Sequence, residues 1–291
     1  TDQIKQLGTA QVAALTTAQA AALTTDQVSA LSGTQVAKLE TADLTKLSTS
    51  TVAALSSAQT RSLTTDQVTA LSTAQAAALS TTSAAALSSV QVAVLETADL
   101  AKLSTDAVAA LTTAALRGLD SNQVAAITTA QLAAVTTEQL ASLTTAQVAA
   151  LTTAQASKLS TDQVASLTTA QVAVLETADL SKLSTDALVA LSTAQLRALS
   201  TDQISGMTTA QTAALTSDQV GSLTTPQLAA LLVGTPMNTM TTAQVAGLTT
   251  AQVVALTTKQ ASELSSTQLA AMTTAQVKAL EVEDLAKIST A

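Results

Sequence analysis

The residues best suited to chemistry in this chain are grouped in a short acidic cassette. It reads L-E-T-A-D-L-x-K-L-S-T at residues 39–49, 95–105 and 175–185, and a looser copy, L-E-V-E-D-L-A-K-I-S-T, occupies residues 280–290. In the three full copies an arginine follows the glutamate by 21 residues, and the chain has no other arginine. The charged residues of these copies are Glu40, Asp43, Lys46 and Arg61; Glu96, Asp99, Lys102 and Arg117; and Glu176, Asp179, Lys182 and Arg197.

Two kinds of site could use these residues. If one superhelical turn takes two octapeptides, each arginine lies over its Glu/Asp pair, where a planar guanidinium binds carboxylates well. The lysine then balances the second carboxylate, and the cassette is a structural ion-pair network. The alternative is a ligand or Ca²⁺ site. Ca²⁺ takes about six to eight oxygen ligands, more than one Glu and one Asp supply, so we predict ion pairs and no metal or cofactor.

Composition argues against most other chemistry. The chain lacks His, Cys and aromatic residues, so it has no general base of the usual kind and no thiolate ligand. It contains no phosphate-binding or dinucleotide-binding glycine motif. A net charge of −8 and the lack of aromatic stacking platforms argue against nucleic-acid binding. No apolar run is long enough to insert into a membrane. We therefore expect a protein that is not an enzyme.

The positioning element is an octapeptide, L-T-T-A-Q-V-A-A, which recurs along the chain. Position 1 is a large aliphatic residue at every eighth residue from Leu7 to Leu231 and again from Met240 to Ile288. Positions 2 and 3 are usually Thr or Ser, position 5 is usually Gln, and position 6 is usually Val, Ala or Leu. Such regularity is typical of repeat architectures.

Two architectures fail on this pattern. In one continuous helix an eight-residue repeat drifts by roughly 80° per octad, because the α-helix has about 3.6 residues per turn. A β-solenoid needs corner residues every few positions, and this chain has only seven Gly and two Pro.

A third architecture explains every position. Thr at position 2 and Gln at position 5 form the S/T-x-x-E/Q capping box, and the residues at positions 1 and 6 form a hydrophobic staple. Each octad therefore starts a new helix. Because helices this short are marginal alone, they must pack on one another. We predict an all-α fold: an α-solenoid superhelix of capped helices of about six residues, one per octapeptide, with about two octads per turn.

The array is predicted to be one continuous solenoid over residues 1–291, with one register slip at 232–240. There L-L-V-G-T-P-M-N-T-M adds one residue, and Gly234 with Pro236 interrupts the rhythm. We expect a tolerated insertion that bulges a loop; a kink or partner site is the alternative. Because neither end carries a polar capping repeat, the chain is expected to be a fragment of a longer array.

The stretch L-T-T-A-Q-V-A-A-L-T-T-A-Q resembles the Thr/Gln/Ala-rich octapeptide arrays of very large bacterial proteins, which are secreted or surface-attached and adhesin-like. The resemblance covers the whole chain and implies a spacer or stalk, with no functional residues to transfer. We predict an extracellular structural element of a bacterial surface, whose partners are neighbouring repeats or other copies of itself. The alternatives are a Thr-rich surface that binds ice or polysaccharide, and a self-assembling filament subunit.

Overall fold

Every regular element in the computed structural model is a short helix, and the structure describes residues 2–288, which contain no strand. The chain divides into two units, residues 1–151 and 152–291. The helices of the first unit are α1 (Asp2–Lys5), α2 (Thr9–Ala13), α3 (Thr17–Ala21), α4 (Thr25–Ser29), α5 (Gly33–Val36), α6 (Thr41–Leu44), α7 (Thr49–Ala53), α8 (Ser57–Ser62), α9 (Thr65–Thr69), α10 (Thr73–Ala77), α11 (Thr81–Ala86), α12 (Ser89–Ala93), α13 (Thr97–Leu100), α14 (Thr105–Ala110), α15 (Thr113–Arg117), α16 (Ser121–Ala126), α17 (Thr129–Ala134), α18 (Thr137–Ser142) and α19 (Thr145–Ala149).

The second unit repeats the same arrangement. Its helices are α20 (Thr153–Ala156), α21 (Thr161–Ser166), α22 (Thr169–Ala173), α23 (Thr177–Leu180), α24 (Thr185–Val189), α25 (Thr193–Ala198), α26 (Thr201–Ser205), α27 (Thr209–Ala214), α28 (Ser217–Ser222), α29 (Thr225–Gly234), a 3₁₀ turn η1 (Met237–Thr239), α30 (Thr242–Ala246), α31 (Thr250–Val254), α32 (Thr258–Ser262), α33 (Ser266–Ala271), α34 (Thr274–Ala279) and α35 (Val282–Leu285). The predicted all-α solenoid with one short helix per octad is confirmed.

The capping box predicted for each octad starts these helices. In α19 the Gln147 backbone N–H donates to Thr144 Oγ1 (3.2 Å), and the Thr144 N–H donates to Gln147 Oε1 (2.9 Å). Two of the backbone donors that a helix start leaves unpaired are thereby satisfied. The same pair of bonds recurs in most octads, for example at Thr64 and Gln67.

The chain restarts its helix without glycine. After α8, Leu63 is extended (φ −57°, ψ 136°), and so is the N-cap Thr64 (φ −73°, ψ 161°). Two extended residues are enough to redirect the chain into the next helix. No described residue, glycine or other, has a positive φ, which explains how so few glycines suffice.

The core is built from three positions of each octad. In residues 143–150 Leu143, Gln147 and Val148 are buried, whereas Thr145 and Ala146 are exposed. Position 1 and position 6 supply the apolar burial, at about 25 cal/mol per Å² of apolar surface removed from water. Position 5 places a polar amide among them, and that amide needs hydrogen-bond partners.

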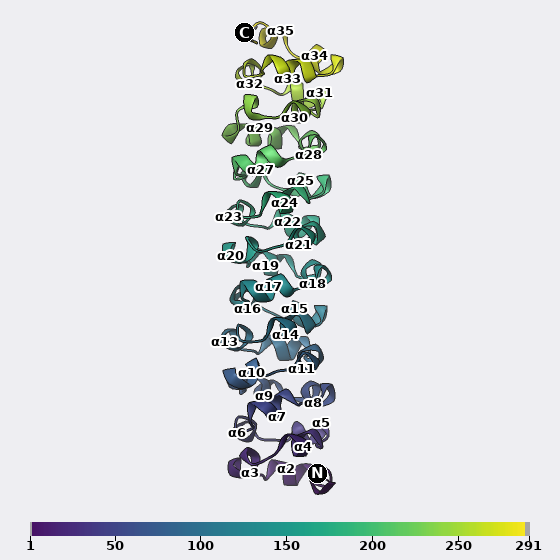
Figure 1. Cartoon of the computed structure of the whole chain (residues 1–291), viewed down its shortest axis with the longest axis vertical. Coiled ribbons are helices and arrows are strands. Elements are labelled where there is room, and N and C mark those ends of the chain that lie inside the picture. Colours follow the sequence, from purple (N-terminus) through teal and green to yellow (C-terminus); the bar gives the residue numbers. More distant parts are fainter. Residues whose placement is uncertain (1, 289–291) are drawn as a thin grey trace. The chain divides into compact units, whose positions relative to one another are not determined.

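Helices stack three apart in the chain, so one turn of the superhelix contains three octads. In the first unit α5 packs on α8, α8 on α11, and α11 on α14, and in Figure 1 α5, α8 and α11 lie above one another. In the second unit α22 packs on α25 and α25 on α28. The predicted turn of about two octads was wrong, because it was inferred from the arginine spacing and the packing follows a different interval.

The glutamine at position 5 joins each turn to the one before it. Gln147 Nε2 donates to the carbonyl oxygens of Leu116 and Leu119, both at 2.8 Å. These acceptors lie 31 and 28 residues earlier, and the same two separations recur at Gln67, Gln75 and Gln131. One amide therefore caps its own helix through its oxygen and bonds the preceding turn through its nitrogen.

Replacing Gln147 by Glu is predicted to destabilise the fold by about 3 kcal/mol at neutral pH, because a buried carboxylate would face two carbonyl oxygens in place of an N–H donor. The acceptor for the Thr144 N–H is kept, so the loss reports the bond between turns. Urea unfolding followed by circular dichroism measures it. Q19E is the matched control: Gln19 makes the same capping box with Thr16 but is exposed. Equal losses in both variants would contradict the bridging role.

Gly118→Ala is predicted to destabilise the fold by about 1–3 kcal/mol through overpacking. An added Cβ would lie 2.4 Å from the Ser89 carbonyl oxygen, which belongs to the helix one turn below. Gly234→Ala is the control, since a Cβ there meets no atom within 4 Å and alanine favours a helix over glycine. Thermal unfolding should separate the two variants; a G118A melting temperature equal to that of G234A would disprove the close approach.

Candidate functional site

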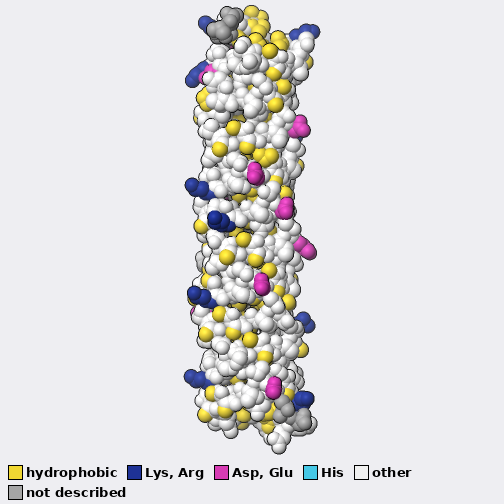
Figure 2. All heavy atoms as spheres, viewed as in Figure 1, with side chains coloured by type: hydrophobic (Ala, Val, Ile, Leu, Met, Phe, Trp, Pro, Cys, Tyr) yellow, Lys and Arg dark blue, Asp and Glu magenta, His cyan; other side chains and the backbone are white. Residues whose placement is uncertain are grey.

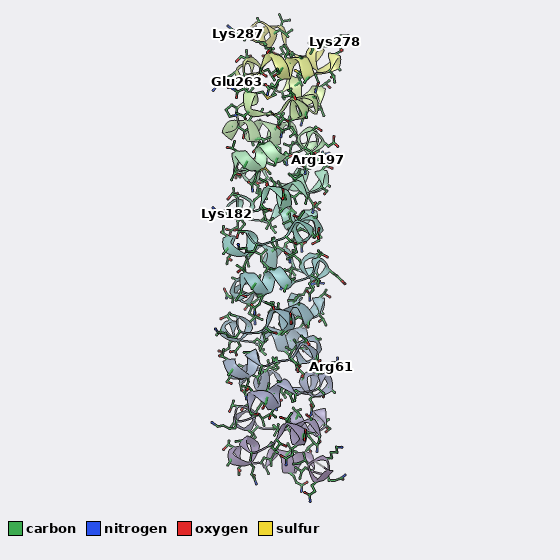
Figure 3. The ribbon with its side chains drawn as sticks, in the orientation of Figure 1. Arg61, Lys182, Arg197, Glu263, Lys278 and Lys287 are labelled. Atoms are coloured by element: carbon green, nitrogen blue, oxygen red, sulfur yellow. The ribbon has the colours of Figure 1, made fainter. Side chains whose placement is uncertain are left out.

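The structure places each acidic cassette at a short, weakly capped helix. Glu40 is the N-cap of α6, a four-residue helix, and its side chain makes no capping hydrogen bond. Glu96 and Glu176 stand at the same place before α13 and α23, also without a cap bond. These glutamates are exposed, as are the lysines and arginines assigned to the cassettes. Figure 3 shows Lys182 and Arg197 on opposite sides of the molecule.

The three arginines do not lie over the carboxylates. Arg61 is on α8, which packs on α5 and α11, whereas α6 packs on α3 and α9. The same displacement separates α13 from the helix of Arg117, and α23 from the helix of Arg197. One turn contains three octads, and helices three apart stack on each other. An arginine two octads after its cassette therefore lies in a different column of stacked helices. The expected alignment was therefore wrong, and within residues 2–288 no cassette carboxylate lies within 4.0 Å of a Lys or Arg nitrogen.

The aspartates of the cassettes are buried at the position that glutamine holds elsewhere. Asp43, Asp99 and Asp179 are 1%, 2% and 1% exposed. Asp43 Oδ2, Asp99 Oδ1 and both carboxylate oxygens of Asp179 have no hydrogen-bond partner. In exchange the cassette helix buries a leucine at position 6, where most octads have valine or alanine; Leu44 is 0% exposed. The cassette octad therefore keeps its buried apolar side chains but lacks the side-chain hydrogen bonds that glutamine makes in other octads.

Burial raises the pKa of two of these carboxyl groups, Asp43 and Asp179. Removal from water raises the pKa of Asp43, and the nearby charge of Glu40 raises it further. Burial also raises the pKa of Asp179; the nearby Thr153 hydroxyl, whose position does not complete a hydrogen bond, partly offsets this, and Glu176 adds to it. Loss of solvation is the main cause in both cases.

The carboxylates are dispersed along the chain. Among the described residues there is no group of three or more His, Cys, Asp or Glu side chains arranged to hold a metal ion. The Ca²⁺ site that the sequence left as an alternative thus has no cluster of acidic ligands in this part of the chain. None of the described helices is long and apolar enough to cross a membrane.

The register slip lengthens a helix, whereas a bulged loop was expected. α29 runs for ten residues and ends at Gly234, so Leu231 continues the helix where position 1 elsewhere ends it. η1 then begins after Pro236, and the Met237 N–H donates to Glu263 Oε2 (3.0 Å). The extra residue moves the acceptors of Gln244 from 31 and 28 residues earlier to 32 and 29.

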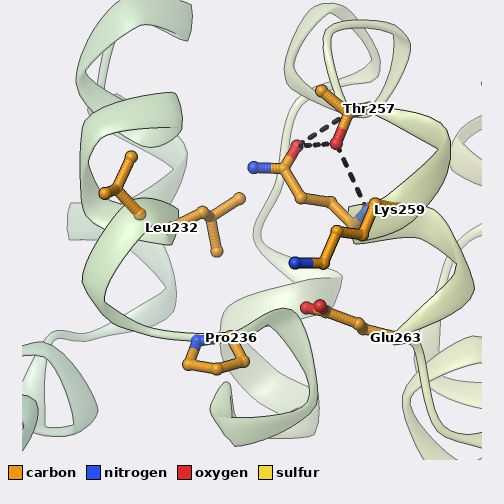
Figure 4. A pocket seen from close by; sticks show the side chains of 7 residues that line it. Leu232, Pro236, Thr257, Lys259 and Glu263 are labelled. Carbon is orange, nitrogen blue, oxygen red and sulfur yellow. Dashed lines mark hydrogen bonds between the residues drawn. The ribbon is translucent and has the colours of Figure 1, made fainter.

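The inserted segment borders a pocket of about 230 Å³. Figure 4 shows Leu232 and Pro236 on one side, with Lys259 and Glu263 on the other. Thr257 and Gln260 also line it and are joined by a capping box. Because Glu263 accepts the Met237 N–H, it links the inserted segment to the end of α32.

The residue that sequence reasoning missed is the glutamine, whose second bond was not foreseen. A signal for it exists. The capping box accepts Glu as well as Gln, yet no octad has Glu at position 5. A position that is glutamine in most octads and never glutamate favours an N–H donor, and only the fold shows where its acceptors lie.

Comparison with known proteins agrees with this repeat. The ALTTAQ repeat profile matches residues 1–33, 36–73, 92–129, 124–161 and 172–209, together more than half of the chain. A search of curated proteins gave no match. The matched segments contain capped octads and acidic cassettes alike, and the chain therefore belongs to the ALTTAQ repeat family.

Proposed function

We propose that this chain is a non-catalytic structural repeat that acts as a spacer, stalk or filament module of a bacterial surface protein. The observation that carries the proposal is the recurring glutamine bond between turns. Within each unit buried glutamines both cap their own helix and bond the preceding turn, for example Gln147 and Gln211. A chain whose polar core joins its own turns is suited to transmitting tension along its axis.

The outward surface supports the same role. In Figure 2 charged side chains are scattered singly over the visible face, among uncharged polar and small apolar groups. Only 11% of the residues are charged, and 12 Lys and Arg offer few sites to trypsin-like proteases. A cysteine-free chain also needs no particular redox compartment. These properties suit an extracellular location, with neighbouring repeats or other copies of the chain as partners.

A second candidate function is a hydroxyl-bearing surface that binds ice or a polysaccharide. One observation favours it. Thr73 and Thr97 begin α10 and α13, which pack on each other, and both residues are exposed. Exposed Ser121 begins α16, which packs on α13. Hydroxyls thus recur along one stack at the interval of one turn, as a repetitive ligand would require.

Force spectroscopy on the full chain, held at both ends, tests the spacer. We expect a ladder of small extensions of up to roughly 80 Å, because three octads released together can span about 3.3–3.6 Å per residue. Repeat proteins hold each unit through its neighbours, so opening should proceed turn by turn. Q147E should lower the first opening force and Q19E should leave it unchanged.

Binding assays separate the alternatives. A spacer should show no thermal hysteresis in ice-growth measurements and no saturable retention on polysaccharide resins. Retention that is lost when Thr73 and Thr97 are changed to Val would instead establish the hydroxyl surface. Light scattering that grows with protein concentration would favour a filament subunit. A single all-or-none extension in the force experiment would refute the spacer that opens turn by turn.

A further inference from the structure

Asp43 and Asp99 occupy a place where the fold elsewhere requires a hydrogen-bond donor. In the neighbouring octads, Gln67 Nε2 donates to Val36 O (2.9 Å) and Leu39 O (2.7 Å), and Gln75 Nε2 donates to Leu44 O and Leu47 O (2.9 Å each). The acceptors always belong to the turn below. An aspartate at this position has the same backbone setting and a shorter side chain.

The equivalent acceptors can be named from the same separations. They are Val12 O and Leu15 O for Asp43, and Val68 O and Leu71 O for Asp99. The carbonyls of Val12 and Val68 accept the backbone N–H of the leucine that begins the next octad, Leu15 and Leu71. No side chain in residues 2–288 donates to Leu15 O or Leu71 O. An ionised carboxylate only accepts hydrogen bonds, so ionised Asp43 and Asp99 would supply none of the donors that glutamine supplies.

None of the helices that pack on α6 or α13 carries a Lys or Arg that could pair with the buried aspartates. α6 packs on α3, which has no charged residue, and on α9, which carries Asp66. α13 packs on α10 and α16, whose helical residues are uncharged, and the N-cap of α16 is Asp120.

The charges beside each aspartate along the chain stay in solvent. They are Lys38, Glu40 and Lys46 around Asp43, and Glu96 and Lys102 around Asp99. Asp43 and Asp99 themselves are 1% and 2% exposed. The packed helices therefore supply no cation to Asp43 or Asp99, and the burial of both side chains excludes water.

We propose that Asp43 is a proton-binding joint of the solenoid. In the neutral acid the carboxyl O–H donates to a carbonyl of the turn below, Leu15 O, and takes the place of the glutamine N–H. In the carboxylate this donor is gone, and a buried charge faces acceptors only. The contact of α6 with the turn below is then tighter in acid and looser at neutral pH, at a fixed point in an otherwise uniform array. Asp99 and Asp179 share the burial of Asp43 and its unpartnered carboxylate oxygen.

The direction of the pH effect follows from the raised pKa of Asp43. A carboxyl whose pKa is higher in the folded state than in the unfolded chain binds its proton more tightly when folded. Its contribution to stability is complete below the unfolded pKa and is lost as the pH rises through the folded pKa. Most buried carboxylates that are paired with cations show the opposite dependence.

The variant D43Q, in the full chain, tests the proposal, since glutamine is the residue that the fold uses at this position. We expect its melting temperature to exceed that of the parent by at least about 2 °C at about pH 7.5, and the gain to shrink towards zero at about pH 3.5. The matched control is D26Q, which removes the same charge from an exposed aspartate on α4. Its effect should not grow with pH in this way.

Two further measurements keep the test decisive. The side-chain carboxyl ¹³C resonance of Asp43 in the parent protein should titrate with a midpoint clearly above 3.8, the ordinary value. A gain in melting temperature of D43Q that is equal at both pH values would overturn the proposal, because glutamine would then act through packing alone. So would stabilisation of the parent, and not of the variant, by CaCl₂ or NaCl at neutral pH, because a metal ion and not a proton would then occupy the joint.

Discussion

The structure depends on a buried glutamine amide that recurs in most octads. Its oxygen accepts the N-cap N–H of its own helix, and its nitrogen donates to carbonyls of the preceding turn. In these octads a single side chain therefore both starts a helix and joins it to the preceding turn. Because the amide lies in an apolar interior, its bonds are strong and the loss of a partner is costly. Helices of four to six residues, marginal alone, become stable as members of the stack.

The octads that have another residue than glutamine at position 5 show which of the glutamine hydrogen bonds the fold can lose. Ser83 keeps the bond to the turn below, since its Oγ donates to Leu55 O (3.0 Å). Ala107 and Ala187 have no polar side-chain atom to donate or accept, and they remain buried without leaving a polar group unpaired. Aspartate is the chemically distinct case, because it buries an acceptor where a donor is needed. Asp43, Asp99 and Asp179 thereby mark the octads in which the chain departs most from its own rule.

The insertion after Leu231 shows how the stack absorbs an extra residue. The helix continues past its usual end, a 3₁₀ turn follows, and Gln244 and Gln252 bond to carbonyls 29 and 32 residues earlier. By Gln268 the separations have returned to 28 and 31. The glutamine side chain bonds the backbone carbonyl that packs next to it, whatever the number of residues between them. A bond of this kind lets a long array tolerate local irregularity without losing its packing.

Local sequence determined the elements of this protein. The Thr–Gln capping box and the leucine before it specify where each helix begins, and those interactions span only a few residues, so a sequence pattern can identify them. The number of helices per turn depends on contacts between octads about 30 residues apart, and no local propensity encodes that closure. The arginine spacing therefore misled, and the buried state of Asp43 could not be read from its neighbours. The tertiary structure decided both, because burial and hydrogen-bond partners are set by whichever turn packs beneath.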